Sequence, residues 1–158
     1  MKKNILLLLL MMLLAIPAFA DEKEDALAFF NNYVESANNY SSAIADMYSP
    51  SAKIIRQIVK PDGTTANATT DTATYVKQMK LGQACAKLRK YKNTYTNINV
   101  ISLGDGSYKV TSLRQPSGED YKLKTYMIVK KQANGEWQII EEMMQTKVQT
   151  LLRYADKE

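Results

Sequence analysis

Few side chains in this sequence could carry acid–base or nucleophilic chemistry. The chain of 158 residues has no histidine and one cysteine, Cys85. Without histidine, Ser-His-Asp and Cys-His nucleophile systems and most zinc sites are excluded. The remaining acid–base candidates are the carboxylates of Asp46, Glu141 and Glu142, which we interpret first as solvated surface charges. The composition therefore favours a protein without catalysis, and we expect neither a cofactor nor a metal.

Cys85 stands between Ala84 and Ala86, a setting typical of a small buried hydrophobe. A reactive thiol beside Lys87 or Arg89 is the alternative interpretation. Because a single cysteine cannot form an intramolecular disulfide, burial of apolar side chains must hold the fold.

Arg56 is the residue that suggests the most specific chemistry. It alternates with Ile54 and Ile58 in an expected strand over residues 52–60, so all three side chains point to one face. If that face is the interior, the guanidinium needs an acid or an anionic ligand, and it could anchor a carboxylate or phosphate head group. The alternative is an arginine at the rim, paired with Glu141 or with water.

Methionine and aromatic side chains suggest either an adaptable pocket or an ordinary core. Met repacks easily around ligands, and the same residues also fill cores. The residues concerned are Met79, Met127, Met143 and Met144, together with Tyr126 and Trp137.

The elements that would position these residues follow from periodicity and turn signals. An amphipathic helix is expected over residues 24–39, followed by a short helix from Ser41 or Ser42 to Met47 and by the strand 52–60. The segment 64–71 is polar and typical of a loop, and Asp71 or Thr72 could cap a helix that ends at Gly82 or continues to Leu88. From Tyr91 on, turn signals such as Asn134-Gly135 separate antiparallel strands, and residues 147–158 could form one more short helix. The order predicts an α+β domain.

This order of elements, with two short motifs, resembles the nuclear transport factor 2-like (cystatin-like) superfamily over residues 24–147. Met47, Tyr48 and Ala52 match a motif before the first strand, and Gly135, Trp137 and Ile139 match a G-x-W-x-I strand. The resemblance implies N-terminal helices packed on a strongly curved antiparallel sheet that forms a cone, often open as a pocket. With such a cone, we predict a ligand-binding pocket whose lining residues are Tyr33, Tyr48, Ile54, Arg56, Met79, Tyr126, Trp137 and Met143. It also implies a homodimer through the outer face of the sheet.

The same resemblance offers an enzymatic alternative. In ketosteroid isomerases of this superfamily, the base is an aspartate eight residues after the tyrosine that corresponds to Tyr48. That position is Arg56 here, and a guanidinium cannot act as a general base near neutral pH. Tyr33 lies within about one position of the oxyanion-binding tyrosine, so the sequence offers a donor without its base.

The N-terminal residues predict export. "MKKN" is followed by twelve apolar residues, Ile5 to Ile16, and then by Ala18 and Ala20 at the positions read by a signal peptidase. We interpret residues 1–20 as a cleaved signal peptide and residues 21–158 as one domain. Since no cysteine follows the cleavage site, we expect a periplasmic or secreted protein without a lipid anchor and, after cleavage, without a transmembrane segment. An uncleaved membrane anchor is the alternative.

Cations cluster between Lys77 and Lys92, where six occur without an acid. The formal charge falls only from +5 to +3 when Lys2 and Lys3 are removed, which does not indicate a nucleic-acid partner. A solvated face, a membrane head-group surface and an acidic protein are the remaining interpretations.

Together these observations predict an exported, non-catalytic binding domain that holds a small amphipathic or anionic ligand, or a partner segment, in a cone-shaped pocket. Three alternatives stay open: a periplasmic lipid carrier related to the toluene-tolerance family, whose ending resembles residues 136–153; an isomerase or cyclase; and a component of an envelope or secretion assembly.

Overall fold

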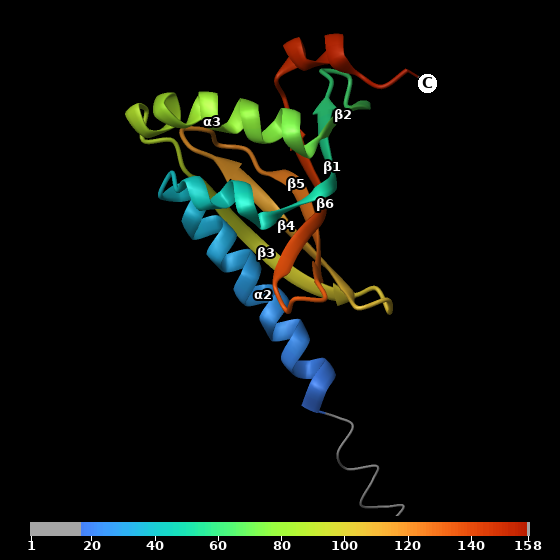
Figure 1. The fold of residues 1–158 in the computed structure, drawn as a ribbon. Coiled ribbons are helices and arrows are strands. Elements are labelled where there is room, and N and C mark those ends of the chain that lie inside the picture. The colour runs from blue at the N-terminus through green and yellow to red at the C-terminus, as the bar shows by residue number, and fades with distance from the viewer. Residues whose placement is uncertain (1–16, 158) are drawn as a thin grey trace, which may run out of the picture.

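A computed structural model describes residues 17–157 of the chain, with side chains from Glu22 on. The elements in chain order are α2 (Pro17–Asn38), the 3-10 helix η1 (Ser42–Met47), β1 (Tyr48–Val59), β2 (Thr65–Asp71), α3 (Thr72–Leu88), β3 (Asn93–Ser102), β4 (Ser107–Pro116), β5 (Leu123–Lys131), β6 (Trp137–Thr146) and the 3-10 helix η2 (Gln149–Tyr154). The helices α2, η1 and α3 lie on one side of a curved sheet (Figure 1), so the expected α+β class is confirmed.

The sheet has six strands in the order β2-β1-β6-β5-β4-β3. Neighbours pair in antiparallel fashion except β1 and β6, which are parallel. This parallel pair brings the first long strand beside the last one, so that residues about ninety positions apart share a face. Arg56 of β1 pairs in register with Met144 of β6, and Ile54 pairs with Glu142.

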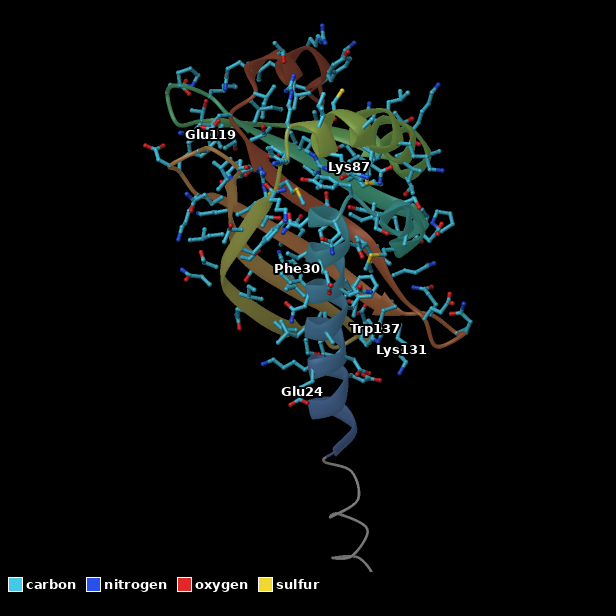
Figure 2. The ribbon with its side chains drawn as sticks, turned by 90° about the vertical axis from the view of Figure 1, so that its left-hand side faces the viewer. Glu24, Phe30, Lys87, Glu119, Lys131 and Trp137 are labelled. Atoms are coloured by element: carbon cyan, nitrogen blue, oxygen red, sulfur yellow. The ribbon has the colours of Figure 1, made fainter. Side chains whose placement is uncertain are left out.

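The helix α2 lies along the concave face and carries much of the core (Figure 2). Ala26, Phe30 and Tyr33 follow each other at helical spacing and are all nearly fully buried. They pack on strand residues that point to the same face, among them Ile54, Val110, Met127, Val129 and Ile139. Phe30 meets Tyr95 of β3 edge-to-face, with ring centroids 5.5 Å apart.

The helix α3 crosses the same side of the sheet nearer to β1 and β2 (Figure 1). Asp71 caps it by accepting a hydrogen bond from the Thr74 backbone N–H at 2.9 Å. Thr72, its one buried residue, donates a hydrogen bond to the Ser49 carbonyl oxygen at 2.8 Å. The helix runs past Gly82 to Leu88, which decides between the two ends predicted from the sequence.

Several boundaries differ from the sequence-based expectations. Residues 65–71, expected as a loop, form β2, because this threonine-rich segment pairs along β1. The first strand begins at Tyr48 rather than at Ala52. The segment at the C-terminus forms the short helix η2, as suggested.

The structure describes only the last part of the predicted signal peptide. Most of the predicted signal peptide, residues 1–16, lies outside the described residues, and α2 begins at Pro17, ahead of the predicted cleavage site. No helix within residues 17–157 is long and apolar enough to cross a bilayer.

Candidate functional site

A cavity of about 300 Å³ opens between α2, η1, α3 and the concave face of the sheet. Its walls are mostly aromatic, apolar or neutral polar, and the thirteen lining residues carry no charge: Tyr33, Ala37, Tyr40, Ser41, Ile44, Tyr75, Met79, Gly82, Gln83, Ala86, Asn93, Tyr95 and Met144. A concave, largely apolar cavity with a few polar groups is the usual form of a small-molecule site.

A buried carboxylate lies behind the cavity wall. Glu142 is fully buried, and its Oε1 accepts a hydrogen bond from the Arg56 guanidinium at 2.8 Å. Its Oε2 accepts from the Tyr48 hydroxyl at 2.5 Å and from the Tyr33 hydroxyl at 3.1 Å. Both oxygens are thus engaged by donors from α2 and β1, which is what burial of a carboxylate requires.

Tyrosine side chains connect this cluster to the cavity. Tyr33 and Tyr75 line the cavity, and the Arg56 guanidinium lies 4.8 Å from the centroid of the Tyr75 ring, a cation–π contact. The Tyr48 ring stands edge-on to Tyr75, with centroids 5.3 Å apart. The Tyr48 hydroxyl donates its proton to Glu142 Oε2, which is closer than the Tyr33 hydroxyl. The 3.3 Å contact between the Tyr48 and Tyr33 hydroxyls is therefore the weaker of the two.

The protonation states of the cluster follow from burial and from the charges. Burial first, and the adjacent Glu142 charge second, raise the pKa values of Tyr33 and Tyr48 well above their usual range. Burial alone would lower the pKa of Arg56, but Tyr75 and Glu142 raise it and prevail. The tyrosines are therefore neutral donors, and Arg56 is a permanent cation.

A second guanidinium, more deeply buried than that of Arg56, lies on the concave face. Arg114 of β4 is 8% exposed; its Nη1 donates to the Asn93 side-chain oxygen and its Nη2 to the Gln145 carbonyl oxygen, each at 2.9 Å. Its Nε is buried without a partner. Among the described residues no carboxylate pairs with Arg114, so two cations and one anion leave this interior with one positive charge in excess.

This arrangement suits anion binding better than proton abstraction. A general base needs a free lone pair within reach of the substrate. Glu142 is surrounded by three donors and is not part of the cavity wall, and Tyr33 already donates its proton to Glu142. In contrast, Asn93 lines the cavity and accepts from Arg114, so the excess charge lies directly behind the wall.

The helix α3 and the segment after α2 close the cavity. The Gln83 side-chain amide donates to the Tyr40 carbonyl oxygen, which links the middle of α3 to residues following α2. Tyr40 has a left-handed backbone, with φ of 57°, and its hydroxyl is buried without a partner. Tyr40 thus lines the cavity with its ring, while its hydroxyl is buried away from it.

Four of the eight predicted pocket residues lie in the wall of the cavity or in the cluster behind it. Tyr33 and Met79 line the cavity, and Tyr48 and Arg56 belong to the buried cluster behind it. Ile54 shares the same face, but it is 1% exposed and serves the core.

The other three residues lie elsewhere. Tyr126 and Met143 pair in register on the opposite, convex face, where they line a second depression with Lys109 and Thr111. Trp137 packs edge-on against Tyr108 at 5.8 Å, towards the end of the sheet away from α3 (Figure 2). The homodimer expected through the convex face stays a prediction.

Three interpretations of single residues change. Glu142, expected as a surface charge, is fully buried, whereas Asp46 is exposed and Glu141 lies half-buried on the convex face. Arg56 pairs with Glu142 rather than with Glu141 or water. Cys85, expected in the core, is exposed, because α3 turns Tyr75, Met79 and Ala86 toward the cavity and Cys85 away from it.

Sequence reasoning missed Tyr75, Tyr95 and Arg114 as site residues. Arg114 alternates with Val110 and Ser112 on β4, a pattern that could have placed it on the inner face. The other face of β4 carries Lys109 and Leu113, so alternation alone gave no preference for either side.

Comparison with known proteins supports the fold. No protein-family model matches the sequence, and no curated protein matches it. A nuclear transport factor 2-like protein of unknown function from Shewanella oneidensis superimposes with a TM-score of 0.58 at 14% identity, covering 78% of this chain and 98% of that one. A cystatin-like domain of unknown function from Nostoc punctiforme gives 0.57 at 16% identity, covering 83% of each chain. A candidate ketosteroid isomerase from Shewanella frigidimarina gives 0.54 at 18% identity, covering 74% of this chain and 91% of that one.

Proposed function

On the nuclear transport factor 2-like fold, which this chain has, we propose that the protein is an exported, non-catalytic binding protein for a small amphipathic anion. The observation that carries the proposal is the uncharged aromatic and apolar cavity with the excess positive charge of Arg114 behind its Asn93 wall. The apolar part of the ligand would contact Met79, Tyr75 and Met144. Its anionic head would lie toward Asn93, where a buried cation stabilises negative charge.

The size of the cavity favours a small ligand over a phospholipid. Its volume of about 300 Å³ is at the lower end for ligand pockets, which span about 300–1,000 Å³. Two acyl chains would not fit without a large opening of α3. This supports a single-ring or single-chain ligand rather than the cargo of the lipid-carrier alternative.

The first experiment is mass spectrometry of the protein purified from the periplasm, under native and then denaturing conditions. We expect a mature chain beginning at Asp21 and the release of a small anionic molecule on denaturation. A chain recovered only with its leader would contradict export, and this result is independent of ligand binding.

A matched pair of probes tests the chemistry of the site. Anilinonaphthalene sulfonate and phenylnaphthylamine share a ring system, but only the first carries a charge. We expect Arg114→Met to weaken sulfonate binding about tenfold, as for a lost charge-assisted interaction, while binding of the neutral probe changes little. Equal losses for both probes would contradict the assigned role of Arg114.

The volume of the cavity can be altered without disturbing the core. Gly82 lines the cavity, and a Cβ built on it meets no atom within 4 Å. Gly82 is exposed at the rim, so the ring of Gly82→Phe should obstruct the cavity and weaken binding of both probes, whereas the control Gly82→Ala should leave binding intact. If Gly82→Phe still binds both probes as wild type does, the cavity is not the site.

Proton transfer is the second candidate function, because a carboxylate touches Tyr33 as an isomerase would require. It predicts turnover of a ketosteroid substrate that Glu142→Gln abolishes. We rank it lower, because all donors around Glu142 would have to move before the carboxylate could act as a base.

A further inference from the structure

The outward face of α3 exposes apolar side chains that nothing in the described chain covers. Leu81 is 73% exposed and Leu88 is 84% exposed, the two highest values among the large hydrophobic residues. Ala84 and Cys85 lie between them on the same side of the helix and are also exposed. Tyr91, just beyond the helix, is exposed as well. A helix that packs only for stability would turn such residues inward.

Cations surround this apolar stripe. Lys77 precedes it on the same face, Lys80 and Lys87 follow one flank, and Arg89 and Lys90 stand at its C-terminal end. All five are exposed, and none of them forms an ion pair with another described residue. Residues 77–92 contain no acid, so the outward face of α3 carries a short apolar stripe with cations at its ends and along one flank.

We propose that the outward face of α3, defined by Leu81, Cys85, Leu88 and the flanking lysines, docks on an anionic lipid bilayer. Interfacial membrane helices also place exposed leucines beside lysines, and α3 has this pairing over part of its outward face. The lysine stems extend past the leucines, so their ammonium groups reach head-group phosphates while the leucines enter the acyl boundary.

The shape of the surface favours a bilayer over an acidic protein. The leucines protrude from a convex helix and do not line a groove, so a protein partner would have to supply a matching concave site. A fluid bilayer accommodates a ridge without such complementarity. Two leucines and a few lysines give weak, reversible and salt-sensitive binding.

This surface is distinct from the cavity, although the same helix contributes to both. Met79, Gln83 and Ala86 face the cavity, and Leu81, Cys85 and Leu88 face away from it. Docking would bring the α3 wall of the cavity to the membrane surface. The inference goes beyond the proposed ligand binding and does not depend on it.

Vesicle sedimentation tests the proposal directly. The full chain, as processed by the cell, is mixed with phosphatidylcholine vesicles that contain about one third phosphatidylglycerol, or with phosphatidylcholine alone. We expect binding only to the anionic vesicles, with release at high salt. Lack of binding to the anionic vesicles would overturn the proposal.

Variants locate the contact on α3. Lys77→Gln, Lys80→Gln and Lys87→Gln together should weaken partitioning about a hundredfold, since each lysine near the surface contributes about fivefold. Leu81→Gln with Leu88→Gln should weaken it at least tenfold. The controls are Lys122→Gln, Lys124→Gln and Lys131→Gln for charge, and Ile101→Gln with Leu103→Gln for exposed apolar area. All these positions are exposed, so the variants should fold, which circular dichroism checks.

Cys85 gives a local readout that no other part of the chain can imitate, because it is the one cysteine in the sequence and is exposed on this face. An environment-sensitive dye on Cys85 should shift its emission to the blue with anionic vesicles. Binding that persists in all α3 variants without a dye shift would overturn the proposal. So would equal binding to polyglutamate with no effect of the leucine changes, which would indicate an acidic protein partner.

Discussion

The two long helices lie on the same side of one sheet, yet they relate to it in opposite ways. The helix α2 buries Phe30 to 2% exposure and Tyr33 to 4%, whereas α3 buries only Thr72 and exposes Leu81 and Leu88. Apolar burial supplies most of the stability of a fold. Most of the core therefore lies between α2 and the strands, whereas α3 is held by its N-terminal cap, by Tyr75 and Met79 at the cavity wall and by the Gln83–Tyr40 hydrogen bond, and its outward face stays exposed.

The cluster around Glu142 is where these two regions meet. It joins Tyr33 of α2 to Tyr48 and Arg56 of β1, and through Arg56 it reaches the Tyr75 ring of α3. A buried carboxylate with three donors holds these elements in one arrangement. The contrast between α2 and α3 is therefore tested first by disrupting the cluster around Glu142.

The largest effect is expected from Glu142→Leu. Removing the carboxylate leaves Arg56 without its charge partner, and the two buried hydroxyls can then pair only with each other, at 3.3 Å. The free energy of unfolding should fall by about 3–5 kcal/mol, measured by urea denaturation. Adding Arg56→Met should recover part of the loss, because the uncompensated charge is removed. The neighbouring control Glu141→Gln should cost much less, and a similar loss there would contradict the special role of Glu142.

The second prediction compares the helices themselves. Phe30→Ala on α2 should lower the free energy of unfolding by about 3–5 kcal/mol, because it leaves a cavity in the core. Met79→Ala on α3 should cost about 1 kcal/mol, since this side chain is only partly buried at the cavity wall. Equal costs in urea denaturation would show that α3 belongs to the stable core after all.

The third prediction concerns alkaline pH. The pKa values of Tyr33 and Tyr48 are raised in the folded state, first by burial and then by Glu142. Their contribution is therefore fully present below the unfolded value of about 10 and is lost as the pH rises toward the folded values. The free energy of unfolding should decline above pH 10, and the decline should be shallower in Tyr48→Phe. Ultraviolet titration of the phenolates should show at least two tyrosines that ionise only on unfolding.

The sequence predicted the order of elements well, because helical periodicity and turn residues act locally. It could not place Glu142. Alternation from the buried Ile139 would put Glu141 inside and Glu142 outside. An irregularity opposite Ile128 and Val129 shifts the register of β6, so the sides are exchanged. Such a bulge depends on the pairing of strands and has no local signature.

The exposure of Cys85 and the formation of β2 also depend on the elements that lie beside them in the fold. Sequence reasoning left open whether the helix after Asp71 reaches Leu88, and it expected Cys85 to be buried. Cys85 is exposed because the inner side of α3 borders a cavity and not a packed core, and Cys85 lies on the other side. The segment 65–71 became a strand because β1 offered an open edge. The exposed outward face of α3 is thus a departure from the pattern of a packed helix.

The smallest expected effect is the most discriminating. Gly82 lies inside α3 with open space around its Cβ position, so Gly82→Ala should strengthen the helix by up to about 1 kcal/mol. If α3 opens separately from the core, hydrogen exchange of its amides should slow by up to about fivefold, while those of α2 and the midpoint of global unfolding stay unchanged. If α3 unfolds only with the rest, the same change should raise global stability and slow exchange in both helices alike. The second result would remove the distinction between a structural α2 and an independently opening α3.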